Sequence, residues 1–327
     1  MALVDSFGRK INYLRLSVTD LCNLRCRYCI PGKRFAARNP NGILGYKDLG
    51  RVARASVSLG VEKIRVTGGE PLHREGIVGF LEDLAGIPGL KRLVVTTNGV
   101  LLGGMARALR TAGVESLNIS LDSLRPEVFS HITRGGDVRS VLNGIAAAEE
   151  AGFPYVKINV VVMRGVNDGE IPDFARLTIE KPYKVRFIEY MPTAADVGWK
   201  SVVVPGGRIL KELSRRYALR SVARDSFSGP AREYRIEGAA GTIGIIAPIS
   251  CHFCGDCNRI RVTSNGIAKS CLFESSGLDL RPFLGESYDP AALKEALRGV
   301  VFGKPEKHGL GDAKKIHEPF LMSQVGG

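Results

Sequence analysis

The sequence lacks any apolar stretch near the roughly 20 residues that a membrane-spanning helix needs. Its first residues also lack the basic segment and apolar segment that together mark a secretory signal. These absences predict a soluble cytoplasmic protein with no membrane partner. At 327 residues and 44% hydrophobic content, the chain is long enough for one large domain and a smaller one.

Aromatic residues are scarce, at 7% of the chain with a single Trp. The net charge of +13 favours an anionic partner, which on charge alone is a nucleic acid, a membrane surface or a phosphorylated metabolite. The basic residues are dispersed, and few aromatic rings are available to stack on bases. This pattern weakens the case for a nucleic-acid partner without excluding one.

Cysteines are confined to two short regions, which argues against a disulfide framework and for a reducing compartment. The first region spaces Cys22, Cys26 and Cys29 as C-x3-C-x2-C. Three thiolates leave one iron of a four-iron cluster without a protein ligand, whereas a structural zinc site normally takes four ligands. The spacing favours a cluster with an open iron, with a zinc site or a redox dithiol as alternatives.

Short β-rich runs alternate with helical patterns between about residues 11 and 190. The predicted strands are 13–18, 63–67, 92–97, 116–121, 156–162 and 184–189, and the predicted helices are 48–59, 77–85, 102–112 and 138–151. A closed eight-unit barrel takes about 250 residues, so six units predict an α/β fold with a partial (β/α)6 TIM-type barrel. The first cysteines follow the first strand, where such folds place catalytic groups.

The pattern changes after residue 190. A stretch punctuated by Gly and Pro is followed by a predicted helix at 208–217 and β-like runs at 233–236 and 243–246. We predict a barrel domain at 1–190 and a smaller α+β domain at 191–327 that covers the open side of the barrel.

The second cysteine region has the spacing C-x2-C-x2-C-x13-C. Its members are Cys251, Cys254, Cys257 and Cys271. Four thiolates could close a zinc site, and three of them could instead hold a second cluster with its own open iron. Arg259 and Arg261 favour the second interpretation, because a site that receives an anionic substrate gains from forked guanidinium donors.

The first cysteine array also has an aromatic residue, Tyr28, before its last cysteine and a predicted strand before its first. This combination resembles the signature of the radical S-adenosylmethionine enzymes. The resemblance implies that the methionine part of S-adenosyl-L-methionine chelates the open iron. One electron from the cluster then cleaves the cofactor to a 5′-deoxyadenosyl radical.

Further motifs follow in order along the chain. They are G-G-E-P at 68–71, T-T-N-G at 96–99, N-I-S-L-D at 118–122, V-K-I-N at 156–159, G-V-N-D at 165–168, R-F-I-E-Y-M-P at 186–192, F-C-x2-C-N-R-x-R-x13-C from 253 to 271, and a final Gly-Gly. From about Arg15 to the last residue, the chain resembles the GTP 3′,8-cyclase family. The resemblance implies cyclisation of GTP to (8S)-3′,8-cyclo-7,8-dihydroguanosine 5′-triphosphate, the first step of molybdenum cofactor biosynthesis.

The same resemblance implies a site with two 4Fe–4S clusters. Their ligands would be Cys22, Cys26 and Cys29 for the first, and Cys254, Cys257 and Cys271 for the second, whose open iron contacts guanine. The cofactor S-adenosyl-L-methionine would contact Tyr28, Gly69, Ser120 and Met191. GTP would contact Arg15, Arg65, Thr96, Lys157, Arg259, Ile260 and Arg261, and the residues needed for turnover would be Arg259, Arg261, Gly326 and Gly327. Cys251 departs from the family pattern and is interpreted as a bystander, with a competing or fourth ligand as alternatives.

The residues themselves support part of this assignment. Gly69 directly follows a predicted strand, so its backbone can approach a ligand closely. Arg15, Arg65 and Lys157 fall within or beside predicted strands, where burying a cation is costly without an anion. Any one of them could face solvent instead, but the group predicts a site for a triphosphate.

The resemblance also implies an external electron donor, a downstream cyclic pyranopterin monophosphate synthase, a possible homodimer and no nucleic-acid partner. Three other classes remain as alternatives, of which a structural iron–sulfur protein without catalysis is the least favoured. A peptide-modifying radical enzyme would need a C-terminal region richer in cysteine, and a zinc-dependent RNA-binding protein would leave the βα repeat and G-G-E-P unexplained.

Overall fold

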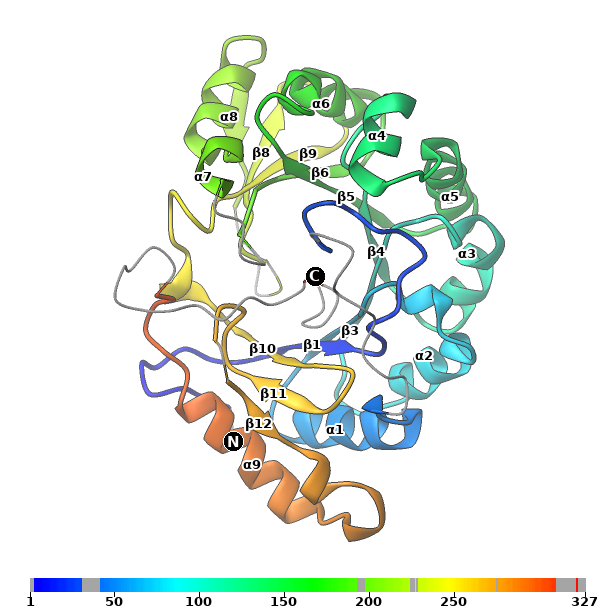
Figure 1. Ribbon diagram of the computed structural model, residues 1–327, viewed down its shortest axis with the longest axis vertical. Coiled ribbons are helices and arrows are strands. Elements are labelled where there is room, and N and C mark those ends of the chain that lie inside the picture. The colour runs from blue at the N-terminus through cyan, green and yellow to red at the C-terminus, as the bar shows by residue number, and fades with distance from the viewer. Residues whose placement is uncertain are drawn as a thin grey trace.

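The computed structural model describes residues 3–30, 42–192, 198–223, 227, 229–274, 276–309 and 322. In these parts of the chain, 12 strands form one curved sheet with helices packed on its outer side (Figure 1). The six central strands are β1 (Tyr13–Ser17), β2 (Lys63–Thr67), β3 (Arg92–Thr97), β4 (Ser116–Ser120), β5 (Tyr155–Val162) and β6 (Lys184–Glu189). They lie side by side in chain order and run parallel, which confirms the predicted partial barrel.

Six helices of the barrel follow or join these strands. They are α1 (Tyr46–Ser58), α2 (Ile77–Ala85), α3 (Leu102–Thr111), α4 (Pro126–Thr133), α5 (Val138–Glu150) and α6 (Ile171–Glu180). Gly113 ends the turn after α3 with φ +88°, and an added Cβ would lie 2.6 Å from the Cβ of Ala85, so this turn requires glycine. The sequence analysis did not predict α4 and α6, which both carry Pro in the first turn.

The C-terminal region adds strands to both edges of the barrel. Its elements are α7 (Trp199–Val202), α8 (Gly206–Ser214), β7 (Leu219–Ser221), β8 (Arg232–Ile236), β9 (Thr242–Ile246), β10 (Arg259–Val262), β11 (Ile267–Lys269), β12 (Leu278–Asp279) and α9 (Pro290–Phe302). Strand β9 pairs in parallel with β6 at one edge, and β10 pairs in parallel with β1 at the other. The connection between them, residues 247–258, therefore passes from one edge to the other and carries three cysteines.

Alternation along the strands separates an apolar outer face from a polar inner face. On β5, Val156, Ile158 and Val160 belong to the buried core between sheet and helices, whereas Lys157 and Asn159 project from the opposite face. Each fully buried aliphatic side chain contributes about 1.5–3 kcal/mol. The outer face thus stabilises the barrel and leaves the inner face for polar residues.

Glu189, at the end of β6, connects the barrel to the C-terminal region. Its side chain is fully buried, and one carboxylate oxygen accepts a hydrogen bond from the backbone N–H of Gly206 at 2.6 Å. The other oxygen accepts from the N–H groups of Ile249 and Ser250 at 2.8 and 3.0 Å. The Ser250 hydroxyl also donates to this carboxylate. One side chain therefore fixes the start of α8 and the start of the edge-to-edge connection.

Within the described residues, none of the helices has both the length and the apolar character needed to cross a membrane.

Replacing Glu189 with Ala should lower the free energy of unfolding by at least about 2 kcal/mol, because buried backbone N–H groups lose their acceptor. Chemical denaturation followed by circular dichroism measures this change. Glu180, exposed at the end of α6, is the control, and Glu180→Ala should change stability by less than about 0.5 kcal/mol. Equal effects of the two substitutions would contradict the role given to Glu189.

Candidate active site

A pocket lies inside the barrel, lined by the strands and by both cysteine regions. Of the residues predicted for the site, those that line it are Cys22, Cys26, Cys29, Cys254, Cys257, Cys271, Tyr28, Gly69, Ser120, Met191, Arg15, Arg65, Thr96, Arg259 and Arg261. The structure therefore brings together two groups of three cysteines, and the groups are separated by more than 200 residues in sequence. Cys251 is exposed and does not line the pocket.

The first cysteine loop is held by backbone contacts on two sides. The N–H of Gly69 donates to the carbonyl of Thr19 at 2.7 Å, and that of Arg27 donates to the carbonyl of Ile132 at 2.9 Å. A Cβ added at Gly69 would lie 2.2 Å from the carbonyl oxygen of Leu21. The sequence analysis attributed this glycine to close approach of a ligand, and the structure shows that close approach of the cysteine loop also requires it.

Glu70 is a buried carboxylate beside this loop. It accepts hydrogen bonds from the Thr97 hydroxyl at 2.8 Å and from the Asn98 N–H at 2.7 Å. Burial raises the pKa of Glu70 to about 7, although these hydrogen bonds oppose the shift. The side-chain amide of Asn98 donates to the sulfur of Cys22 at 3.7 Å. The segments after β2 and β3 are thus joined to the first cysteine.

Asp122 is a second buried carboxylate near the first cysteines. It accepts from the Tyr28 hydroxyl and from the Val161 N–H, both at 2.8 Å, and burial raises its pKa to about 6. Burial also raises the pKa of the Cys22 and Cys26 thiols, and nearby carboxylates add to this effect. Thiolates in such surroundings need positive charge, which the iron of a cluster supplies. The donor set therefore fits an iron–sulfur cluster.

The second set of cysteines lies in more basic surroundings. Cys254 and Cys257 flank a single helical turn before β10, and Cys271 follows β11. Burial raises the pKa of Cys257, but the positive charges of Arg259 and Lys304 outweigh it and lower the value to about 6. A lowered thiol pKa favours the thiolate that a metal binds. These three thiols therefore also fit a cluster.

Two histidines lie beside Cys254. The ring nitrogens of His252 and His308 are 3.0 Å apart, and these nitrogens and the Cys254 sulfur all lie within 4.8 Å of one another. Such a group suits zinc, but it shares Cys254 with the second cysteine triplet. Because Cys254 cannot be a ligand of a zinc ion and of a cluster at once, the zinc and iron content of the protein distinguishes the two sites.

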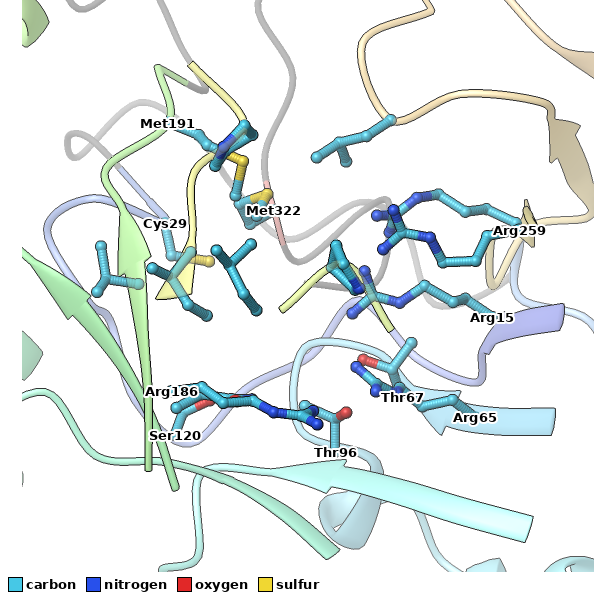
Figure 2. A pocket seen from close by; sticks show the side chains of 18 of the residues that line it. Arg15, Cys29, Arg65, Thr67, Thr96, Ser120, Arg186, Met191, Arg259 and Met322 are labelled. Atoms are coloured by element: carbon cyan, nitrogen blue, oxygen red, sulfur yellow. The ribbon is translucent and has the colours of Figure 1, made fainter. Parts of the chain in front are cut away.

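The inner face of the barrel carries a row of arginines. Strand register aligns Arg261 on β10, Arg15 on β1 and Arg65 on β2. Burial, together with repulsion from neighbouring cations, lowers the pKa of all three groups, to about 10 for Arg261. Figure 2 shows Arg15, Arg65 and Arg259 reaching into the same space, with Cys29 and Met191 on another side of it.

Arg186 on β6 joins this group, although the sequence analysis did not include it in the site. It lines the pocket beside Ser120 and Thr96, and one guanidinium nitrogen donates to Glu233 at 2.8 Å (Figure 2). Gly244, its register partner on β9, leaves room for it, since an added Cβ would lie 3.0 Å from the Arg186 Cγ. The rule that selected Lys157, a cation within a strand, also selects Arg186.

Lys157, Ile260 and the C-terminal glycines differ from the other predicted residues. Lys157 does not line the pocket; its ammonium donates to the Ser116 hydroxyl at 3.3 Å. Burial and then the charge of Arg186 lower its pKa well below the usual range. Ile260 has its side chain in the hydrophobic core, so only its backbone is left for a ligand. Gly326 and Gly327 lie outside the described residues.

The electrostatics of the interior favour a highly charged anion. Several buried cations repel one another, and among the described residues Glu233 forms ion pairs with Arg186 and Lys184. The hydroxyl of Thr96 is buried without a hydrogen-bond partner in the described parts of the chain. A polyphosphate would supply both the negative charge and the acceptors that these groups need.

Comparison with known families gives two adjacent matches. Residues 16–178 match the Radical SAM superfamily, and residues 183–310 match Molybdenum Cofactor Synthesis C. The crystal structure of Streptococcus suis SuiB bound to the precursor peptide SuiA superimposes with a TM-score of 0.61, 16% identity, and coverage of 92% of this chain and 67% of that chain. At this identity the likeness concerns the fold alone. The fold and the first cysteine loop define a radical S-adenosylmethionine enzyme.

Whole-length relatives identify the family within this class. GTP 3′,8-cyclase of Geobacter sulfurreducens is 60% identical over 327 residues, covering 100% of both chains. GTP 3′,8-cyclase of Alkaliphilus oremlandii is 42% identical over 324 residues, covering 99% of both. The chain belongs to the GTP 3′,8-cyclase family.

Gly69→Ala should displace the first cysteine loop, because the new methyl group would overlap the carbonyl of Leu21. We expect loss of about half of the iron from the anaerobically reconstituted protein, with the second site still loaded. Iron per chain and cluster absorbance measure this. Gly79 in α2 is the matched control: nothing lies within 4 Å of its added Cβ, so Gly79→Ala should retain all iron. A full iron content in Gly69→Ala would contradict the packing argument.

Tyr13 on β1 should report the charge of the interior. Burial disfavours its phenolate, but Arg65 and Lys63 lower its pKa from 10.0 to about 8. The difference between wild-type and Tyr13→Phe near-ultraviolet titrations should show a midpoint near this value. Inorganic triphosphate should raise the midpoint, because an anion cancels the cations that favour the phenolate.

The same shift has a defined effect on stability. Because the folded pKa of Tyr13 lies below the unfolded value, its contribution is fully present above about pH 10 and is lost as the pH falls through about 8. A midpoint near 10 in the absence of triphosphate would show that the interior is not positively charged.

Proposed function

We propose that the shared pocket is where this enzyme cyclises GTP to (8S)-3′,8-cyclo-7,8-dihydroguanosine 5′-triphosphate, in the first step of molybdenum cofactor biosynthesis. The observation that carries this proposal is the arrangement of two cysteine triplets around one interior lined with buried cations. Neither triplet alone distinguishes a radical cyclase from other iron–sulfur proteins. The combination supplies a site for radical generation and a site for a nucleoside triphosphate within the same cavity.

The first triplet, Cys22, Cys26 and Cys29, holds a 4Fe–4S cluster. When bound together, this cluster and S-adenosyl-L-methionine supply the 5′-deoxyadenosyl radical that removes hydrogen from the ribose. Tyr28, Gly69, Ser120 and Met191 line the pocket on the side of this triplet and hold the cofactor. The buried carboxylates Glu70 and Asp122 suit a ligand that carries a sulfonium cation.

The second triplet and the cations hold GTP. Cys254, Cys257 and Cys271 would hold the second cluster, which would offer a binding site for the guanine. The nucleotide is bound by residues that line the pocket, namely Arg15, Arg65, Thr96, Arg259 and Arg261. Arg186 also lines the pocket and adds a further positive charge. Lys157 does not line the pocket and contributes through its charge. Their task is to place the ribose against the cofactor and to keep water away from the radical.

The C-terminal tail completes the site. Met322 lines the pocket, and Gly326 lies four residues further along the chain. Four or five residues span at most about 14 to 18 Å, so the length of the chain allows Gly326 and Gly327 to reach the interior. Their lack of side chains permits close backbone approach to the nucleotide, which is the role we assign to them.

The chain divides at residues 190 and 191 into the barrel and the C-terminal domain. We place the enzyme in the cytoplasm, where an external electron donor reduces it. Its product passes to cyclic pyranopterin monophosphate synthase. The homodimer is the assembly we propose.

The function is tested by an anaerobic assay of reconstituted protein with dithionite, S-adenosyl-L-methionine and GTP. We expect about eight irons per chain, four for each cluster, with formation of both 5′-deoxyadenosine and the cyclised nucleotide dependent on GTP. Deoxyadenosine without cyclised nucleotide would instead favour a peptide-modifying radical enzyme. Zinc in place of the second set of irons would favour the site at His252, Cys254 and His308.

The roles of the cations are tested in the same assay. Arg259→Ala should raise the dissociation constant of GTP by about 10- to 100-fold, the cost of one charged hydrogen bond. Lys157→Ala should raise it less, because Lys157 does not line the pocket and acts through its charge. Cleavage of S-adenosyl-L-methionine by dithionite should remain largely intact. Arg107→Ala removes the same charge from an exposed position on α3 and should leave GTP affinity unchanged. Unchanged GTP affinity in both Arg259→Ala and Lys157→Ala would overturn the assignment of these cations to the GTP site.

A further inference from the structure

Lys304 is a buried lysine that the proposed reaction does not yet use. It lies two residues after α9 and is 3% exposed, although lysine is almost never fully buried unless paired. Its ammonium donates to the backbone carbonyl of Arg259 at 3.0 Å and to that of Ser270. No carboxylate in the described parts of the chain forms an ion pair with it.

The two carbonyls that Lys304 contacts belong to the two segments that carry the second triplet. Arg259 follows Cys257 by two residues and begins β10, while Ser270 directly precedes Cys271 after β11. These strands pair in antiparallel fashion, with Arg261 opposite Lys269. A single ammonium group therefore fastens both ligand-bearing segments at the points where they leave the sheet.

The positive charge of Lys304 requires an anion that backbone carbonyls do not provide. Three cysteine thiolates outweigh the positive charge of a 4Fe–4S core, so the loaded second site would be anionic. The natural counterion of this lysine is therefore the metal centre.

A neighbouring cation shows what a purely structural contact looks like. Arg9 donates to the carbonyl of Cys254 at 2.8 Å and to those of Glu306 and Pro305 at 2.9 and 2.7 Å. Its charge is neutralised by an ion pair with the buried Asp5 at 2.5 Å. Arg9 thus fixes the chain around Cys254, whereas Lys304 both fixes the chain and adds positive charge.

We propose that Lys304 is a positioning residue of the second cluster, holding its two ligand-bearing segments together and stabilising the reduced cluster through its charge. This inference rests on the proposed function, because it takes Cys254, Cys257 and Cys271 as cluster ligands. Positive charge close to a cluster favours addition of an electron, and hydrogen-bonded partners around the ligands set metal affinity. Both effects are measurable without any turnover of GTP.

The experiment uses the full chain with Cys22, Cys26 and Cys29 each changed to Ala, so that iron reports on the second site alone. In this background, Lys304→Met removes both the charge and the hydrogen bonds. Lys304→Gln removes the charge but keeps amide donors for the carbonyls. Lys307→Met removes an equal charge from an exposed position three residues away and is the control. Two quantities are measured anaerobically: the rate of iron loss to a chelator and the reduction potential of the cluster.

We expect Lys304→Met to lose iron about 10- to 100-fold faster than its parent and to have a more negative reduction potential. Lys304→Gln should show the same direction of shift in potential with slower iron loss than Lys304→Met. Should Lys304→Met not fold by circular dichroism, the potential of Lys304→Gln carries the test. Potentials and iron-loss rates equal to those of the parent and of Lys307→Met would overturn the proposal.

The parent protein separates this inference from the proposed function. If the parent with three cysteines removed binds no iron, the assignment of the second triplet fails. If it binds about four irons but the Lys304 variants have the same iron-loss rate and reduction potential as the parent, the role of Lys304 fails while the function stands.

Discussion

The interior of this barrel depends on one electrostatic constraint: strand alternation turns several cations inward, where burial and mutual repulsion disfavour their positive charge. Arg15, Arg65 and Arg261 occupy one register row, and each has a lowered pKa because of burial and repulsion. The apolar outer face offsets this cost through packing against the helices. The interior is therefore arranged in advance for an anion, and binding energy goes into positioning rather than into rearranging the protein.

The two cysteine triplets face one pocket but differ in electrostatic surroundings. Glu70 and Asp122 make the first side acidic, while Arg259 and Lys304 make the second side basic. A sulfonium cofactor and a triphosphate carry opposite charges, so each has a preferred side. The charge distribution thus favours the cofactor beside the first triplet and the triphosphate beside the second, and it disfavours the exchanged arrangement.

The sequence predicted the six central strands to within one or two residues, because apolar residues alternate with polar ones over each of them. It also predicted the cysteine triplets, and most residues that it assigned to the site line the pocket, because spacing within a motif is local information. It did not predict that β9 and β10 extend opposite edges of the barrel, since strand pairing depends on contacts between distant segments. Lys304 was missed for the same reason, because the carbonyls that it contacts belong to segments distant in sequence, whereas the rule that selected Lys157 could have found Arg186.

Residues 247–258 connect β9 and β10, the strands that extend opposite edges of the six-strand barrel. A covalent link of fixed length sets an upper limit on how far the edges can separate. Glu189 anchors one end of this link to β6, and Arg9 holds Cys254 within it. Iron held by Cys254, Cys257 and Cys271 would join this link to the segment after β11 and would further limit the separation of these strands.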